Sequence, residues 1–364
     1  MTRPSTRWLA HMMLGLAVIT AAFAWVAAKP APSAEGEERV RRSSPSAAPS
    51  PTVAGSSTSP SSSTTPSPTS SPSPSPEPTP EPVSVAAAGD IACAPGHEFF
   101  NHGRGTATWC RAADTRAVIR ALDPDVVLPL GDTQYDSGRL SEYYGSYDLS
   151  WGKLLRRTRP AIGNHEYYAS SNARGYFSYF GDRAGELGKG WYAYDLGAWH
   201  VVALNSNCQL LPCVKGSEQH TWLRDELAAN PASCTLAYFH HPRFSSGPHG
   251  DDPSVTPLWQ LLYRAGVEVI LVGHDHIYER FAPLTPLGEV DQEHGIRQFI
   301  VGTGGAQLYP ITEVRTHSRA RNTESFGALE LRMREASYRW RFVPVDQGGF
   351  RDRGSARCHG APEL

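Results

Sequence analysis

The sequence predicts an α/β fold in which strands and helices alternate in layers. Short apolar runs typical of buried strands are separated by segments with helical spacing, and α/β domains show this alternation. The strand-like runs lie at 83–88, 126–130, 159–162, 199–204, 235–239 and 267–272. The helical patterns lie at 112–122, 140–155, 218–229 and 257–265. Runs at 298–305, 326–333 and 338–343 predict further strands closed by hairpins.

The first 28 residues predict export. Arg3 and Arg7 precede a stretch from Trp8 to Ala28 that holds no Asp, Glu, Lys or Arg. That stretch is close to the roughly 20 residues that span a bilayer, so a cleaved signal peptide and a retained membrane anchor are both open. If the segment is not cleaved, the arginines on its N-terminal side would stay on the cytoplasmic side of the membrane, and the rest of the chain would lie on the outer side. We therefore expect a protein that is secreted, or anchored with its folded domain extracellular.

Residues 29–82 are mostly Pro, Ser, Thr, Ala and Glu, with Ser-Pro repeats at 71–76. This composition predicts a disordered linker, extended at about 3.1 Å per residue, that could tether a domain to a membrane or cell wall. Regular apolar patterning begins at Val83, so residues 83–364 form the predicted catalytic domain. The oligomeric state is not predicted.

The six cysteines all lie in this domain, and an even number in an exported chain favours disulfides. Fifteen connectivities are possible. Local pairing of Cys93 with Cys110, and of Cys208 with Cys213, would leave Cys234 to tie Cys358. The formal net charge is -2 and the pI is near 6.7, so we expect no binding to a nucleic-acid duplex.

Five of the predicted strands end in side chains that bind metal ions. The motifs are Gly89-Asp90, Gly131-Asp132-Thr-Gln-Tyr135, Gly163-Asn164-His165-Glu166, His240-His241-Pro242 and Gly273-His274-Asp275-His276. Ligands gather at the carboxyl ends of strands in such sheets. Carboxylates, imidazoles, an amide and a phenol form a mixed oxygen and nitrogen set that suits Fe, Zn or Mn. A carboxylate shared by two ions would hold them about 3.5 to 4 Å apart.

This ordered set of motifs resembles the calcineurin-like metallophosphoesterases, in particular the purple acid phosphatase branch. The tyrosine three residues after the second aspartate is similar to the tyrosinate ligand of that branch. The resemblance covers 83 to about 305. It implies two packed mixed β-sheets flanked by helices, an αββα sandwich with the metal site at the carboxyl ends of strands.

The resemblance also implies two metal ions and their ligands. The first ion, ferric in the family, would be held by Asp90, Asp132, Tyr135 and His276, with Asp132 as a bridge. The second ion, a divalent Fe, Zn or Mn, would be held by Asn164, His240 and His274. His165 and His249 resemble histidines that face the substrate.

One motif departs from the family pattern. The first motif is usually G-D-x-G, whereas this chain has Gly89-Asp90-Ile91-Ala92. The aspartate is kept, but the backbone after it is not expected to turn on a glycine. Cys93 follows at once, so we expect a disulfide to shape this loop.

The expected function is an exported binuclear phosphatase that hydrolyses phosphomonoesters. Metal ions lower the pKa of bound water towards 7, and the resulting hydroxide can attack a phosphate ester in line. No serine or cysteine lies in a nucleophile-elbow pattern, so no phosphoenzyme is expected. The alternative is a phosphodiesterase or nucleotide pyrophosphatase, because the same metal pair can serve either kind of ester. Loops 168–191 and 284–297 would then select the leaving group. An alternative of another class is a surface-displayed binding domain with structural metals.

Several other residues near the motifs have weaker assignments. His241 either faces substrate or supports His240, and Arg243 either reaches a phosphate or forms a surface ion pair. Residues 278–280 are expected to form a structural network, and 302–305 a tight turn beside the site. No chemistry is assigned to seven further histidines: His97, His102, His200, His220, His294, His317 and His359.

Overall fold

The computed structural model describes residues 81–360. The predicted signal peptide or anchor and nearly all of the predicted linker lie outside the described residues, so these predictions stay untested. Within the described part, no helix has the length and apolar character needed to cross a membrane.

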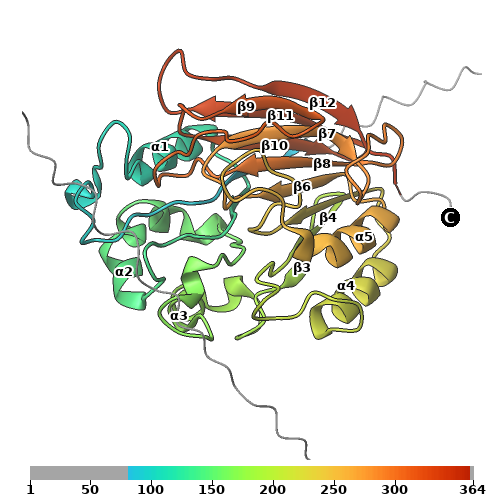
Figure 1. Ribbon diagram of the computed structural model, residues 1–364, viewed down its shortest axis with the longest axis horizontal. Coiled ribbons are helices and arrows are strands. Elements are labelled where there is room, and N and C mark those ends of the chain that lie inside the picture. Colours follow the sequence, from blue (N-terminus) through green and yellow to red (C-terminus); the bar gives the residue numbers. More distant parts are fainter. Residues whose placement is uncertain (1–80, 361–364) are drawn as a thin grey trace, which may run out of the picture. The chain divides into compact units, whose positions relative to one another are not determined.

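The described chain has twelve strands, which are interspersed with helices as far as β6 and then follow one another without a helix from β6 to β12 (Figure 1). The strands are β1 (Val83–Ala88), β2 (Val126–Pro129), β3 (Tyr192–Leu196), β4 (Trp199–Ala203), β5 (Cys234–Tyr238), β6 (Val269–Val272), β7 (Tyr278–Leu284), β8 (Ile296–Val301), β9 (Ser318–Asn322), β10 (Gly327–Arg334), β11 (Ser337–Pro344) and β12 (Arg353–Arg357). The α-helices are α1 (Ala112–Leu122), α2 (Leu140–Gly145), α3 (Arg174–Phe180), α4 (Glu218–Ala229) and α5 (Thr256–Arg264).

The strands form two mixed sheets, as the resemblance implied. One has the order β12-β11-β10-β1-β2, and the other β3-β4-β5-β6-β8-β7-β9. Aromatic side chains from the two sheets pack against each other, with ring centroids 5.8 Å apart for Trp199 and Tyr338 and 4.6 Å apart for Tyr278 and Phe342. A second apolar cluster, which includes Leu223 of α4 and Trp259 of α5, covers the other face of the seven-stranded sheet.

The strands that carry the motifs run parallel, which brings their ends to common edges. Strands β1 and β2 are parallel neighbours, and β4, β5, β6 and β8 are parallel in the second sheet. Parallel strands present their carboxyl ends at the same edge of a sheet. The motif residues that follow β1, β2, β5 and β6 therefore converge.

Two predicted elements are wrong. Residues 159–162 form no strand: Ala161 makes one isolated bridge, as does Thr158 just before the range, because Pro160 between them has no N–H to donate to a ladder. The predicted helix 140–155 ends at Gly145, and two 3₁₀ turns follow at Tyr147–Leu149 and Trp151–Arg157. Ser146 breaks the helix with φ of -140° and ψ of -66°.

The expected disulfides are confirmed. Cys93 bonds to Cys110, Cys208 to Cys213 and Cys234 to Cys358, and none of the described cysteines is free. The first bridge closes the loop after Asp90, where the glycine of the family motif is missing. The loop itself runs beside the loop after β2, with the Ile91 amide donating to the Asp132 carbonyl at 3.0 Å.

Candidate metal centre

Three predicted ligands leave their strands through a left-handed backbone conformation. Asp90, Asp132 and His274 have φ of 61°, 44° and 70°. Such a conformation costs about 1 kcal/mol or more outside glycine and persists where surrounding contacts fix it. The turns bring the side chains back over the strand ends and aim them at one another.

Glycines before these residues allow very close packing. A Cβ atom at Gly131 would lie 2.5 Å from His240 Nδ1, and one at Gly273 would lie 2.6 Å from Asp90 Oδ2. Only a residue without a side chain fits at such distances. The strand-end glycines are therefore part of the site's architecture.

The first group of donor atoms surrounds the Tyr135 hydroxyl. That hydroxyl donates to Asp90 Oδ1 at 3.0 Å, and lies 3.2 Å from Asp132 Oδ2 and 2.9 Å from His276 Nε2. His276 Nε2 is 3.3 Å from Asp90 Oδ1. All four side chains are buried.

The second group is centred on His240. Its Nε2 lies 3.3 Å from Asp132 Oδ2 and 3.1 Å from Asn164 Oδ1. His274 lies beside it, with ring centroids 5.0 Å apart. The two groups share Asp132, which is 2% exposed. The structure thus brings together all seven predicted ligands.

These groups fit metal ions in distance and in charge. Donors bound at about 2.0 to 2.2 Å to one ion lie roughly 3 Å apart, as these atoms do. Among the described residues, Asp90 and Asp132 form ion pairs only with histidines, since neither meets a Lys or Arg. Buried carboxylates need paired charge or a metal.

The histidine tautomers also fit metal binding. His240 Nδ1 donates to the Leu130 carbonyl at 2.8 Å, and His276 Nδ1 donates to the Gln307 carbonyl at 2.6 Å. Their Nε2 atoms consequently point into the site. Ligating histidines usually hold their second nitrogen in this way.

The pKa shifts follow from burial and neighbouring charge. Burial lowers the pKa of His240, but Asp132 beside it raises this pKa to about 9. Burial raises the pKa of Asp132, but His240 and His165 hold it well below its usual range. Burial and neighbouring histidines lower the pKa of His274, which leaves a neutral imidazole. A cation could therefore bind His274 directly and replace a proton at His240.

The two predicted substrate-facing histidines lie at the rim. The His165 amide donates to Asp132 Oδ1 at 2.9 Å, and its Nδ1 donates to the Asp136 carbonyl at 2.6 Å. His249 Nδ1 lies 2.9 Å from Asp275 Oδ1, and its ring packs on His274 at 4.2 Å. Asp275, between two predicted ligands, is fully buried and orients His249. The motif pattern had assigned no role to this aspartate.

Glu166 is a second supporting residue to which the motif pattern had assigned no role. Its carboxylate is 1% exposed and accepts from the amides of Asp132 at 3.0 Å, Thr133 at 2.8 Å and Gly163 at 2.7 Å. It therefore joins the loop that carries Asp132 to the loop that carries Asn164. An acidic residue two positions after Asn164 is the only sequence signal for this role.

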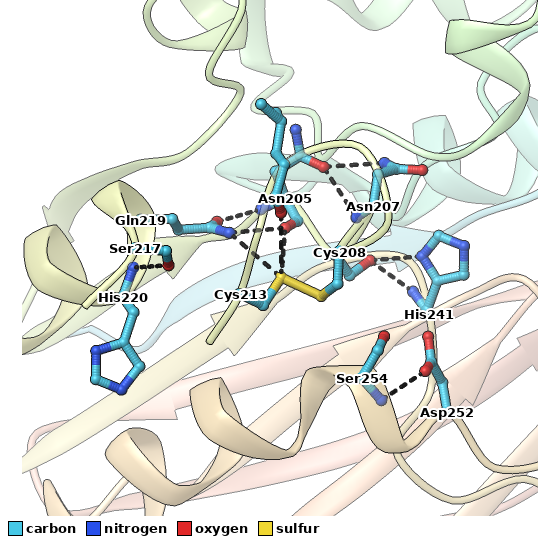
Figure 2. The surroundings of a disulfide bond; sticks show 12 residues. Asn205, Asn207, Cys208, Cys213, Ser217, Gln219, His220, His241, Asp252 and Ser254 are labelled. Carbon is cyan, nitrogen blue, oxygen red and sulfur yellow. Dashed lines mark hydrogen bonds between the residues drawn. A yellow bond between two sulfur atoms is a disulfide. The ribbon is translucent and has the colours of Figure 1, made fainter. Parts of the chain in front are cut away.

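A loop after β4 supports the second group. Ser206 Oγ accepts from the amides of His240 at 3.2 Å and His241 at 2.9 Å. Figure 2 shows the Cys208–Cys213 disulfide closing this loop, with His241 beside it. His241 Nδ1 is 2.8 Å from Ser206 Oγ, and burial lowers the pKa of His241 to about 3. This contact favours the supporting role for His241.

Two tyrosines frame the rim, and no sequence pattern pointed to either. Tyr168 is 62% exposed, accepts from Asn164 Nδ2 at 2.9 Å and packs on the His165 ring at 4.4 Å. Tyr309 stacks on His276 with ring centroids 4.0 Å apart. Tyr168 thereby turns the Asn164 oxygen towards His240.

The weaker candidates lie outside the two groups. The Arg243 guanidinium packs over the Phe244 ring at 4.5 Å and forms no ion pair among the described residues. Tyr278 and Arg280 both bind Asp352, which confirms a structural network. Residues 302–305 form a turn whose Gly304 amide donates to the Gly89 carbonyl at 2.9 Å. None of the seven unassigned histidines joins the donor groups within the described chain.

Comparisons with known proteins agree with this geometry. Residues 83–278 match the family model for calcineurin-like phosphoesterase. Purple acid phosphatase 21 from Arabidopsis thaliana is 32% identical over 190 residues, which cover 46% of this chain and 41% of the relative. Acid phosphatase type 7 from Danio rerio is 28% identical over 195 residues, which cover 44% of this chain and 42% of the relative. The chain spans about two fifths of the length of these curated relatives.

A solved structure shows the same fold. Purple acid phosphatase PPD1 from yellow lupin (Lupinus luteus) matches with a TM-score of 0.60 at 19% identity, over 75% of this chain and 53% of that chain. This match confirms the predicted arrangement of two sheets with flanking helices. The family model itself covers more than half of the 364 residues. The chain therefore belongs to the calcineurin-like phosphoesterase family.

Proposed function

We propose that the domain hydrolyses phosphomonoesters with a pair of metal ions. The observation that carries the proposal is the convergence of carboxylate, phenol, imidazole and amide donors into two groups that share Asp132. One ion, Fe(III), would be held by Asp90, Asp132, Tyr135 and His276. The other, a divalent Fe, Zn or Mn, would be held by Asn164, His240 and His274, with Asp132 as the bridge.

The chain's own side chains would place the ester and its leaving group. When bound, two such ions lower the pKa of a coordinated water and neutralise the phosphoryl oxygens. His165 presents Nε2 to the site, because its Nδ1 is engaged by the Asp136 carbonyl. A protonated His165 can donate to the leaving oxygen, and His249, fixed by Asp275, can donate to a phosphate oxygen.

We also propose that the chain acts outside the cytoplasm on a small phosphate ester. Three disulfides support this location, because such bonds persist in oxidising compartments. The arginine-flanked apolar segment near the N-terminus supports export as well. If this segment is retained, it and the Pro-rich linker would tether the domain. If the segment is cleaved, the domain would be released.

The first test compares two esters that share one aryl leaving group. We expect the metal-loaded full chain to show a kcat/KM for the monoester at least about tenfold above that for the diester, a difference of roughly 1.4 kcal/mol in transition-state stabilisation. A preference for the diester would favour the phosphodiesterase alternative. No turnover of either ester with bound metal would favour the binding domain.

A second test identifies the first ion by colour. A phenolate bound to Fe(III) gives a visible charge-transfer band, so we expect the iron-loaded protein to absorb in the visible range and Tyr135→Phe to lose that band. Tyr144→Phe is the matched control, since Tyr144 is 60% exposed. An active protein that is colourless when isolated with its own metals would point to Zn or Mn.

A further inference from the structure

The outward face of β10, β11 and β12 carries six exposed arginines. They are Arg332, Arg334, Arg339, Arg341, Arg353 and Arg357, hereafter the arginine face. Alternate positions of the same strands, such as Leu331 and Trp340, are buried between the sheets. The period-2 alternation of strands therefore sorts the arginines to one surface. The three strands lie together at one end of the five-stranded sheet (Figure 1).

Positive charge on this face is only partly balanced. The register places Arg332 opposite Arg339, and Arg341 opposite Arg353. Like charges directly opposite each other in antiparallel strands are destabilising. Glu330, which is 2% exposed, is the carboxylate on these outward positions, and both Arg332 and Arg341 bind it. The other four arginines have no ion-pair partner among the described residues, so an added anion would relieve their repulsion.

The shape of the face suits a chain-like anion. A shallow groove of about 610 Å³ lies on it, lined by Arg332, Arg339, Arg341 and Arg353 together with Glu330, Trp340, Gly354 and Ser355. No large hydrophobic side chain is exposed on these three strands, so this surface has nothing to insert into a bilayer. Guanidinium groups match phosphate oxygens in a bidentate geometry.

We propose that the arginine face binds a linear, phosphate-rich polyanion. The surface is separate from the metal centre: Arg332 is paired with Ser84 near the start of β1, whereas Asp90 follows the end of that strand. The proposal does not depend on the proposed phosphatase activity. It describes a second site that would hold a phosphate polymer against the domain.

Long-chain inorganic polyphosphate is the probe. The full chain carrying Asp132→Asn, which prevents hydrolysis of the probe, is compared with the same chain carrying Arg339→Gln and Arg353→Gln in addition. Neither arginine forms an ion pair in the described structure, so both sheets should remain folded. We expect the two arginine substitutions to raise the Kd for polyphosphate at low salt by at least about tenfold. The slope of log K against log salt should also fall by about 1.4, which is two contacts at roughly 0.7 each.

The matched control replaces two exposed helical arginines, Arg224→Gln and Arg264→Gln, and so changes the net charge equally. This control should leave the Kd for polyphosphate within about twofold of the value for the chain that carries Asp132→Asn alone. The reason is that binding is proposed to depend on the arrangement of arginines on the arginine face and not on the net charge. Equal losses in both double variants would overturn the proposal. So would tighter binding of phosphatidylglycerol vesicles or of duplex DNA than of polyphosphate. A circular dichroism spectrum verifies that each variant is folded.

Discussion

Asp132→Asn is expected to lower kcat by at least about a thousandfold while leaving the fold intact. The carboxylate is the one side chain common to both donor groups, with Oδ2 3.2 Å from the Tyr135 hydroxyl and 3.3 Å from His240 Nε2. An amide has nearly the same shape but no charge and one fewer oxygen. Loss of roughly 4 kcal/mol of charge stabilisation corresponds to this rate change.

The stability of Asp132→Asn shows whether its loss of activity comes from a lost catalytic role or from unfolding. The histidines beside Asp132 can lose their protons, so the substitution leaves no buried charge without a partner. Urea unfolding should therefore show a free energy within about 1 kcal/mol of wild type. Asp182→Asn, at an exposed position, is the matched control and should keep full activity. An Asp132→Asn protein that unfolds, or that turns over at the wild-type rate, would contradict the proposed role.

Glu166→Gln is expected to destabilise the domain by about 3 kcal/mol and to lower kcat/KM as well. Both carboxylate oxygens accept hydrogen bonds from backbone amides, including those of Thr133 and Gly163. A glutamine turns an NH₂ group towards one set of these donors. At least one buried amide then lacks an acceptor, and a buried hydrogen-bonded charge is lost.

Thermal unfolding measures this effect. A loss of this size corresponds to a melting temperature lower by about 5 to 10 °C in a domain of this length. Glu186→Gln is the control, because Glu186 is exposed and its one ion-pair partner among residues 81–360 is Lys189, at 2.8 Å. That change should cost about 0.5 kcal/mol or less. Equal melting temperatures for Glu166→Gln and wild type would show that the carboxylate does not join the two loops.

Residues of the site could be predicted wherever they are tied to a strand end. Asp90, Asp132 and His274 directly follow apolar runs, so the periodicity of the sequence is enough to place them at the edge of a sheet. Tyr309 follows no strand and lies far along the chain from His276, on which it stacks. Tertiary packing alone brings these two rings together, and no local pattern encodes it.

Edge strands were missed for a related reason. Strands β9 and β12 have the sequences SRARN and RGSAR, which lack the apolar alternation of a half-buried strand. Charged residues on edge strands are common because they discourage pairing with other chains. Strand β12, together with β10 and β11, shows why the net charge of -2 did not reveal the arginine face: sheet register, rather than composition, gathers these side chains.

The pairing of β1 with β10 sets the order in which the domain can be completed during synthesis. Val83 pairs with Met333, 250 positions later in the chain. Until β10 has left the ribosome, Val85 and Ala87 lack the partners that bury them in the finished sheet. Pairing over such a separation is intrinsically slow and leaves apolar surface exposed meanwhile. A chain that stops before residue 327 therefore contains every predicted metal-binding motif but has no β10 to hold β1, the strand that Asp90 follows.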